Sequence, residues 1–553
     1  MRTSLLTSSV RNPRTYITLV AILVFAAGVH WGTFVVGGSD SYCYVHQAEG
    51  WAAGHLQQVE PLALDAPWPA APLTFAPAGH IPSPTVRGAA VPICPAGLSI
   101  VMAPFLRAGS ALGRPDAVFI VVPLFGALLI GATNALGSRF SACAGVSSAL
   151  LVTCSPAFLF QLMQPMSDVP AAALWILAAV CASSRHRRAP LGAGLATSGA
   201  ILIRPNLLPM GLVLGLHFLL PDSEYSNGPG QESEYGDRLR PESEYAAPSG
   251  RTPTPGVRGA RTPTPRGIAR AVTFALASAP GCIAVAIIQQ LFYGSPFSSG
   301  YGSLAGLFAL DHVAPNALRY VTWMWQSHTP VWLIALAAPI VLPRRLTTLL
   351  LALSIANVLC YLPYVVFNDW WYLRFLLPAI ALVLVLTAAT IDAMLRGVKR
   401  RGLLVAAVTA VICVLLIGEA RGRQVFGLRQ VERRYERAGL YVASHLPANA
   451  IVITSWESGS VRFYGHRKTV VWDVLDPMWL DRVIVYSRSR GLQPYLLFEA
   501  WEEPLFRQRF AGSVVARLDW PPVAEIAGQV RIYRPDDRQR YLHGNAAPTD
   551  YAR

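Results

Sequence analysis

Long uncharged apolar runs constrain the fold of this chain more than any other feature. The first covers residues 16–36 and reads YITLVAILVFAAGVHWGTFVV. About 20 such residues are enough for an α-helix to cross the roughly 30 Å hydrocarbon core of a bilayer. Ten further runs cover 117–136, 141–163, 169–184, 191–203, 205–220, 271–293, 320–342, 346–367, 375–391 and 402–418. We therefore expect an all-α polytopic membrane protein with about 11 transmembrane helices.

The composition agrees with this class. Hydrophobic residues make up 53% of the 553 and charged residues only 14%, whereas a soluble domain carries about 25% charged residues. The net charge of +15 would point to nucleic acid in a soluble protein. In a membrane protein it reflects basic cytoplasmic loops and anionic headgroups, so we expect membrane lipids as partners and no nucleic acid.

The first run has two readings, because a signal peptide also begins with an apolar core. Residues 16–36 are longer than a typical signal-peptide core, and no small-x-small cleavage site follows them cleanly. We interpret this run as a retained first span.

Basic residues indicate the orientation of the spans. They gather in SSRHRR (183–188), PRR (343–345) and RGVKRR (396–401), while the loops between these clusters mostly hold one each. The positive-inside rule places the clusters in the cytoplasm, together with the N-terminus. The loop that begins near Asp40 then lies outside.

Parity tests one doubtful segment. The chain must cross the membrane an odd number of times between Asp40 outside and Arg185 inside, and four candidates are available if PICPAGLSIVMAPFL (92–106) is counted. This segment is short and contains three prolines. We predict that it is a juxtamembrane or re-entrant helix, which leaves the C-terminus outside.

Residues 222–266 differ from the rest. SEY recurs at 223, 233 and 243, and RTPTP at 251 and 261, among Pro, Gly, Ser and Glu. Such a composition cannot bury a core, so we expect a disordered, low-complexity cytoplasmic insertion within a membrane domain that covers residues 1–420.

From residue 421 onward the composition becomes that of a soluble protein. AIVITSW (450–456) and PYLLFEA (494–500) resemble short buried strands, and DPMWLDRVIVYSRSR (476–490) an amphipathic helix. We predict a small α/β domain over 421–553, on the same outer side as Asp40. Its aromatic and charged residues suit either acceptor binding or a scaffold.

The eight cysteines form no CxxC pair, so they indicate neither a zinc site nor a redox motif. Six of them lie inside apolar runs. Cys43 and Cys94 share one extramembrane region, where they either pair in an oxidising compartment or stay unpaired.

Three ionisable residues at the edges of apolar runs share the outer side in this topology. Asp40 follows the first span, Asp168 opens the fourth, and Arg204 separates the two short runs at IRPN. An ionisable group at membrane depth is costly unless it pairs or faces water, which makes each a functional candidate. Interfacial solvation is the alternative, and for Asp168 a helix N-cap is a second one.

These residues suit group transfer from a lipid carrier. A carboxylate such as Asp40 can take the proton from an attacking acceptor hydroxyl. The departing polyprenyl phosphate needs positive charge, which Arg204 or Arg374 can supply.

At these positions the sequence resembles the GT-C glycosyltransferases, in particular the branch of protein mannosyltransferases and aminoarabinosyltransferases. The resemblance covers most of residues 15–420. It is carried by Asp40 with SYCYVHQAEGWAAGHL, by QPMSDVPAAALWILA, by GAILIRPN, by LFYGSPFSSGYG (291–302) and by FNDWWYLRFLLPA (367–379).

The resemblance implies a helical bundle with juxtamembrane helices in the first outer loop. It also implies an inverting transfer from a polyprenyl-phosphate sugar, with Asp40 as the base, Asp168 lining the site and Arg204 near the donor phosphate. Ser41 replaces the second acid of the mannosyltransferase DE pair, which puts a protein acceptor in doubt. No DxD motif occurs in this loop, which argues against an obligatory divalent metal, and no other cofactor is indicated.

Three further residues are candidates for substrate binding. Arg374 is a second phosphate ligand or simply the ion-pair partner of Asp369. Glu49 assists the base or lies on a helix surface, and Tyr293 opens a Gly- and Ser-rich segment that gates the acceptor or only connects two helices.

The sequence thus predicts a glycosyltransferase, for a hexose or a pentose, in the inner membrane of a bacterium. It would move one sugar from a polyprenyl-phosphate donor to a glycan, lipid or protein acceptor on the outer face. A transporter or flippase for a lipid-linked glycan is the alternative, although we see no inverted repeat of the kind typical of transporters. A degenerate, inactive site is the third hypothesis.

Overall fold

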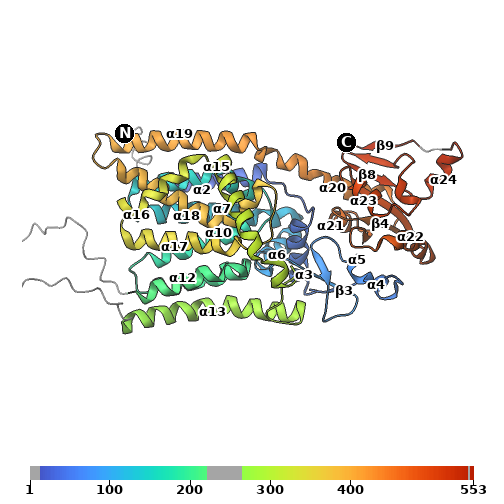
Figure 1. The fold of residues 1–553 in the computed structure, drawn as a ribbon, viewed down its shortest axis with the longest axis horizontal. Coiled ribbons are helices and arrows are strands. Elements are labelled where there is room, and N and C mark those ends of the chain that lie inside the picture. Colours follow the sequence, from blue (N-terminus) through green and yellow to red (C-terminus); the bar gives the residue numbers. More distant parts are fainter. Residues whose placement is uncertain (1–12, 221–263, 546–547, 553) are drawn as a thin grey trace, which may run out of the picture.

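The computed structural model describes residues 13–220, 264–545 and 548–552. The insertion predicted over 222–266 lies outside these residues apart from its last three, which begin a long helix. Most of the chain up to residue 422 forms helices that run side by side, and the remaining residues form an α/β region at one end of this bundle (Figure 1).

The bundle consists of apolar helices of 7 to 29 residues. These are α2 (Pro13–Trp31), α7 (Val121–Gly137), α8 (Ala142–Cys154), α9 (Pro156–Leu162), α10 (Asp168–Ala182), α11 (Ala189–Ile203), α12 (Leu208–Leu219), α13 (Pro265–Tyr293), α17 (Arg344–Tyr361), α18 (Leu377–Met394) and α19 (Arg401–Gly422). The core helix α18 is almost wholly buried, whereas α13 and α19 expose most of their apolar side chains at the rim. An apolar exterior of this kind is what a helix needs in contact with lipid.

Among the described residues, five helices are long and apolar enough to cross a membrane. Counting α8 and α9, which meet at an angle of 62°, as one bent span gives up to six. Several other apolar helices are shorter, among them α10, α11 and α12. The structure is therefore that of a multi-pass membrane protein, while the number of 11 spans stays a prediction.

The expected span over 320–342 is wrong as a single helix. The amphipathic helix α15 (Val313–His328) ends at Thr329, which has a positive φ of 57°. A 3₁₀ segment η5 (Pro330–Ala337) and α16 (Ala338–Val341) follow in its place. Pro330 disfavours a helical conformation in the residue before it, and buried His328 is hydrogen-bonded to Ser155 of the neighbouring helix at 2.8 Å.

Two shorter helices close the end of the bundle that meets the α/β region. They are α3 (Asp40–Ala53) and α6 (Ala96–Ala111), which pack against each other (Figure 1). The chain between them contains α4 (Pro61–Asp65), α5 (Ala71–Thr74) and a small antiparallel sheet in the order β1-β3-β2, formed by Gln58–Val59, Ala89–Pro92 and His80–Pro82. The segment 92–106 predicted to be juxtamembrane or re-entrant thus contributes to a short helix at this end.

The C-terminal region is a six-stranded mixed sheet with helices. Helix α20 (Leu428–His445) leads into it, and the strand order is β5-β4-β6-β8-β7-β9. The strands are β4 (Ala450–Thr454), β5 (Lys468–Val471), β6 (Gln493–Glu499), β7 (Ala524–Ile526), β8 (Val530–Tyr533) and β9 (Asp550–Ala552). Strands β5, β4 and β6 are parallel. This confirms both predicted strands, and α22 (Leu480–Ser489) confirms the predicted amphipathic helix.

The two parts of the molecule meet closely at α3. Ser458, at the start of α21 (Ser458–Phe463), accepts a hydrogen bond from the backbone N–H of Ala78 at 2.8 Å. Gly459 packs so tightly on Tyr42 that an added Cβ would lie 2.5 Å from its ring. The α/β region is therefore anchored directly on the loop and helix that contain Asp40.

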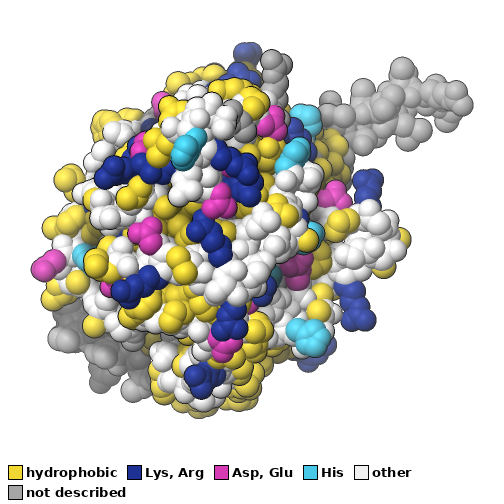
Figure 2. All heavy atoms as spheres, turned by 90° about the vertical axis from the view of Figure 1, so that its right-hand side faces the viewer, with side chains coloured by type: hydrophobic (Ala, Val, Ile, Leu, Met, Phe, Trp, Pro, Cys, Tyr) yellow, Lys and Arg dark blue, Asp and Glu magenta, His cyan; other side chains and the backbone are white. Residues whose placement is uncertain are grey.

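Basic and acidic side chains are interspersed with apolar ones on the face at the far end of the α/β region (Figure 2). No extended patch of one sign covers that face.

Glu457 makes the stability of the α/β region depend on pH. Burial raises the pKa of its carboxyl to about 8, with Arg434, Glu499 and Glu502 as its charged neighbours. Between roughly pH 4.5 and 8 the folded protein retains a proton that the unfolded chain releases, so stability falls as pH rises through this window. We predict that Glu457→Gln flattens this decrease in the melting temperature of the purified protein, measured from pH 5 to 8.5. The half-exposed control Glu525→Gln should keep it, and equal slopes in all three proteins would contradict the assignment.

Candidate active site

Asp40 pairs with Arg374 at the end of the bundle. Asp40 is the first residue of α3, and Arg374 lies in η6 (Trp370–Leu376), directly before α18. The Arg374 guanidinium donates a hydrogen bond to Asp40 Oδ2 at 2.9 Å. The side chain of Asp40 is 34% exposed and that of Arg374 15%. The carboxylate is thus held in place but remains accessible.

A second, deeper pair joins Arg204 and Asp168. Arg204 ends α11, where Pro205 prevents the helix from continuing, and Asp168 is the first residue of α10. The guanidinium donates to Asp168 Oδ1 at 2.6 Å, to Ser167 Oγ at 3.1 Å and to the Tyr361 hydroxyl at 3.0 Å. The Asp168 side chain has no exposed surface. Ser167 occupies the N-cap position, so Asp168 is the partner of Arg204 rather than a cap.

Phe375 brings the two pairs into one group. The guanidinium carbon of Arg204 lies 5.6 Å from the centre of its ring, and that of Arg374 lies 5.2 Å from the same centre. Tyr361 stacks on Phe375 with ring centres 4.8 Å apart. Cation–π contacts of this kind stabilise a guanidinium that has left water. Two carboxylates and two guanidiniums therefore form a compact, charge-balanced cluster.

A cavity of about 460 Å³ lies beside this cluster. Its walls include Arg204 and Ser167 on one side and Val285 and Ile288 of α13 on another. Most of its lining is apolar or aromatic, with a few polar groups such as Ser167, Arg204 and Asn206. Such a lining fits a ligand with an apolar portion and a polar head.

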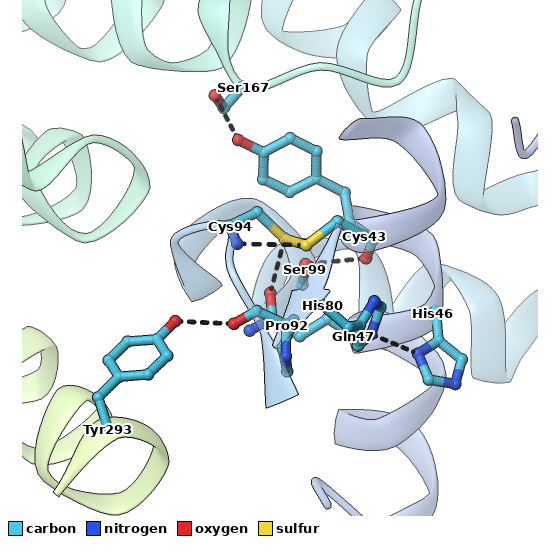
Figure 3. Close-up of a disulfide and its surroundings, with 10 residues drawn as sticks. Cys43, His46, Gln47, His80, Pro92, Cys94, Ser99, Ser167 and Tyr293 are labelled. Carbon is cyan, nitrogen blue, oxygen red and sulfur yellow. Dashed lines mark hydrogen bonds between the residues drawn. A yellow bond between two sulfur atoms is a disulfide. The ribbon is translucent and has the colours of Figure 1, made fainter. Parts of the chain in front are cut away.

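Tyr293 also lines this cavity, at the end of α13. Its hydroxyl donates a hydrogen bond to the carbonyl of Pro92 at 2.7 Å, and Figure 3 shows the ring extending from its helix toward that carbonyl. Tyr293 therefore joins α13 to the loop before α6. The structure places this predicted residue at the site.

A disulfide between Cys43 and Cys94 fixes α3 to the loop before α6 (Figure 3). Of the two alternatives left by the sequence, the structure has the paired one. Tyr44, the next residue in α3, donates a hydrogen bond from its hydroxyl to Ser167 at 2.8 Å, and Ser99 of α6 donates to the Tyr44 carbonyl at 2.8 Å. The orientation of α3, and with it that of Asp40, is thus fixed at several points.

Two predicted contacts are not found at this cluster. Glu49 lies in a separate cavity of about 560 Å³ together with Arg107, Asp116 and Glu436, and burial raises the pKa of its carboxyl to about 7. Arg374 pairs with Asp40 and not with its sequence neighbour Asp369, which is exposed at the start of η6. An ion pair between residues 334 positions apart left no local trace in the sequence.

Four residues of the site were missed by the sequence analysis: Tyr44, Ser167, Tyr361 and Phe375. Two of them carried a usable signal. Tyr44 lies one helical turn after Asp40, and Ser167 directly precedes Asp168. Within the described parts of the chain, no group of three or more His, Cys, Asp and Glu side chains is arranged to hold a metal ion.

The fold was compared with solved structures. ArnT from Cupriavidus metallidurans in the apo state is similar over 96% of this chain and 98% of its own, with a TM-score of 0.54 and 14% identity. ArnT from the same organism bound to undecaprenyl phosphate gives a TM-score of 0.53 at 13% identity, over 96% and 99% of the two chains. The apo oligosaccharyltransferase of Archaeoglobus fulgidus covers 92% of this chain and 73% of its own at 12% identity, with a TM-score of 0.49. No protein-family model and no curated protein matches the sequence.

The architecture is that of a multi-pass membrane protein with an appended α/β region. More particularly, the likeness to ArnT shows that the chain has the GT-C fold. This confirms the resemblance found in the sequence at the level of the fold.

The disulfide should contribute measurably to stability, since it closes a loop of 51 positions. Removing it with Cys43→Ser and Cys94→Ser is expected to cost about 2–4 kcal/mol. We predict a lower melting temperature for this double variant in detergent, and a similar decrease when the wild type is reduced. Cys282→Ser, at a half-buried cysteine of α13, is the matched control and should melt like the wild type. An unchanged melting temperature in the double variant would refute the prediction.

Proposed function

We propose that this protein is a membrane glycosyltransferase that moves one sugar from a polyprenyl-phosphate donor to an acceptor hydroxyl. The observation that carries the proposal is the pair of guanidinium–carboxylate contacts beside a largely apolar cavity. Arginine binds phosphate oxygens through forked donors. The cavity accommodates the apolar beginning of the lipid, while the cluster faces its phosphate and sugar.

The different exposure of the two acids supports different roles for them. Asp40 is one-third exposed and can meet an acceptor, so it is the general base. Asp168 has no exposed surface, so it acts through Arg204 as a positioning residue. The sequence-based hypothesis counted Asp168 with Asp40 among the catalytic candidates, as a residue that lines the site, whereas here it positions a guanidinium.

The reaction is a single displacement that inverts the anomeric carbon. The acceptor oxygen forms a bond to that carbon as the bond to the donor phosphate oxygen breaks. The acceptor proton passes to Asp40, and the electron pair of the broken bond leaves with polyprenyl phosphate. Arg204 and Arg374 stabilise the charge that develops on the departing phosphate.

Two observations support the donor and the side of the membrane. One ArnT structure with this fold contains undecaprenyl phosphate. The disulfide beside Asp40 is of a kind that forms in oxidising compartments. We therefore place the reaction on the outer face of a bacterial inner membrane, with the α/β region on that side and about 11 spans with a cytoplasmic N-terminus. Glu49 is not assigned a role at this cluster.

Asp40→Asn should abolish transfer while leaving the protein folded. In cells that lack the protein, we predict that the wild type restores one sugar of an envelope glycan and that Asp40→Asn does not. Mass spectrometry of lipid-linked sugars should then show the polyprenyl-phosphate donor accumulating. Asp369→Asn, which changes an exposed carboxylate five residues before Arg374, is the control. Full complementation by Asp40→Asn at normal expression would refute the base assignment and favour a transporter.

Asp168 and Arg204 should behave as one unit in donor binding. We predict that Arg204→Lys raises the KM for the donor by about tenfold, since lysine has lost the forked geometry. Asp168→Asn should have a comparable effect by releasing the guanidinium, and the double variant should be little worse than either single one. The measurement is a steady-state separation of KM from kcat on purified enzyme. Additive losses would show that the two residues act independently.

A further inference from the structure

Two tryptophans stand out at the carboxyl ends of neighbouring parallel strands. Trp456 follows β4 and Trp501 follows β6, each two residues after the strand ends. Their indole rings form an edge-to-face pair with centres 5.7 Å apart. They are 44% and 49% exposed. Large aromatic side chains are normally buried, so two adjacent exposed indoles mark a surface for interaction.

Carboxylates hold this pair in place. Trp501 Nε1 donates a hydrogen bond to Glu499 Oε2 at 3.0 Å. Glu502 accepts from the backbone N–H of Trp456 at 3.4 Å and from that of Glu499 at 2.9 Å. Hydrogen bonds therefore connect the two strand ends and hold the Trp501 ring before any ligand binds. Such preorganisation lowers the entropic cost of binding.

Further polar groups adjoin Glu499, the hydrogen-bond partner of Trp501. Arg434 of α20 donates to Glu499 at 3.1 Å and to Glu432 at 3.4 Å. The side chain of Glu499 is only 7% exposed, and its Oε1 accepts no hydrogen bond in the described structure. Carboxylates next to aromatic faces suit a ligand that has both C–H faces and hydroxyl donors.

The surface is linked to the loop that contains Asp40. Arg434 also donates to the Tyr435 hydroxyl at 3.0 Å. The Tyr435 ring packs on Gly37, where an added Cβ would lie 2.2 Å from it. Contacts thus run without interruption from Trp501 through Arg434 and Tyr435 to the residues directly before Asp40. In Figure 1, α20 and α21 likewise lie on the side of the α/β region that faces α3.

We propose that Trp456 and Trp501 form the binding surface for a carbohydrate acceptor, which they present to Asp40. A pyranose or furanose ring packs its C–H face on the indoles and donates a hydroxyl to Glu499, whose Oε1 has no hydrogen-bond partner in the described structure. The inference rests on the proposed function for the role of acceptor, but the carbohydrate-binding surface is testable without it.

The charges near the tryptophans distinguish this ligand from a lipid headgroup. Arg434 pairs with Glu432 and Glu499, while Glu502 accepts a hydrogen bond from the backbone N–H of Trp456. Because this guanidinium is already paired, it offers little to an anionic phosphate, whereas a neutral glycan needs no cation. Exposed tryptophans can also sit at a membrane interface, and this becomes one outcome of the test.

The test measures sugar binding to the full-length protein in nanodiscs. The probes are α- and β-linked disaccharides of glucose, galactose, mannose and arabinose, with binding detected by saturation-transfer NMR. We expect at least one disaccharide to bind the wild type. The affinity should fall by about tenfold in Trp456→Ala and in Trp501→Ala, and less in Trp501→Phe, which keeps an aromatic face. The control is Met478→Ala, which removes an 81% exposed apolar side chain of the same region, and it should bind like the wild type.

Three results would overturn the inference. They are the absence of binding by every disaccharide, equal binding by the wild type and the alanine variants, and selective quenching of the two tryptophans by brominated lipids in the nanodisc. The last result would assign the pair to the membrane surface. Circular dichroism of each variant shows whether a loss of binding reflects unfolding.

A second assay distinguishes failure of this inference from failure of the proposed function. It measures whether the wild type releases polyprenyl phosphate from a polyprenyl-phosphate sugar. If the wild type releases polyprenyl phosphate but the tryptophan variants bind disaccharides normally, the surface is wrong and the transferase stands. If disaccharides bind through the tryptophans but no donor is consumed, the surface stands and the transferase is wrong.

Discussion

The structure depends on the cost of holding charge at the edge of an apolar bundle. A guanidinium or a carboxylate there costs several kcal/mol unless a partner of opposite sign reaches it. Arg204 meets Asp168, and Arg374 meets Asp40, with Phe375 in contact with both guanidiniums. Because the four charged residues come from α10, α11, α3 and η6, satisfying them fixes how these elements sit relative to one another.

In the proposed reaction the two pairs have different roles. The buried pair is surrounded by hydrogen bonds to Ser167 and Tyr361, so it is rigid and sets the position of one guanidinium. Asp40 keeps a third of its side chain exposed, and its helix is fixed by the disulfide and by Tyr44. A general base, the role proposed for Asp40, needs both exposure and a fixed position, since it must reach each incoming acceptor with the same geometry.

Features set by local physics were predictable from the sequence. The apolar runs indicated the bundle, the IRPN break placed Arg204 between two helices, and alternating elements indicated the C-terminal α/β region. Non-local pairing was not predictable, and local proximity suggested Asp369 as the partner of Arg374. The break at Thr329 was missed because hydropathy ignores the effect of Pro330. The prediction of Glu49 as a site residue could have been avoided. Glu49 lies nine residues, or two and a half helical turns, after Asp40, which places it on the opposite face of α3.

Helix α3 is where the two halves of the molecule meet. One face presents Asp40 and Tyr44 to the charged cluster, while Tyr42 packs on Gly459 of the α/β region. On the bundle side, Gly37 packs against the ring of Tyr435. At both glycines an added Cβ would lie less than 3 Å from a tyrosine ring. Glycine at these two positions therefore allows the α/β region to pack this closely on the bundle. Because the α/β region contacts α3 directly, an acceptor bound there would meet Asp40 at a distance fixed by packing rather than by a flexible linker.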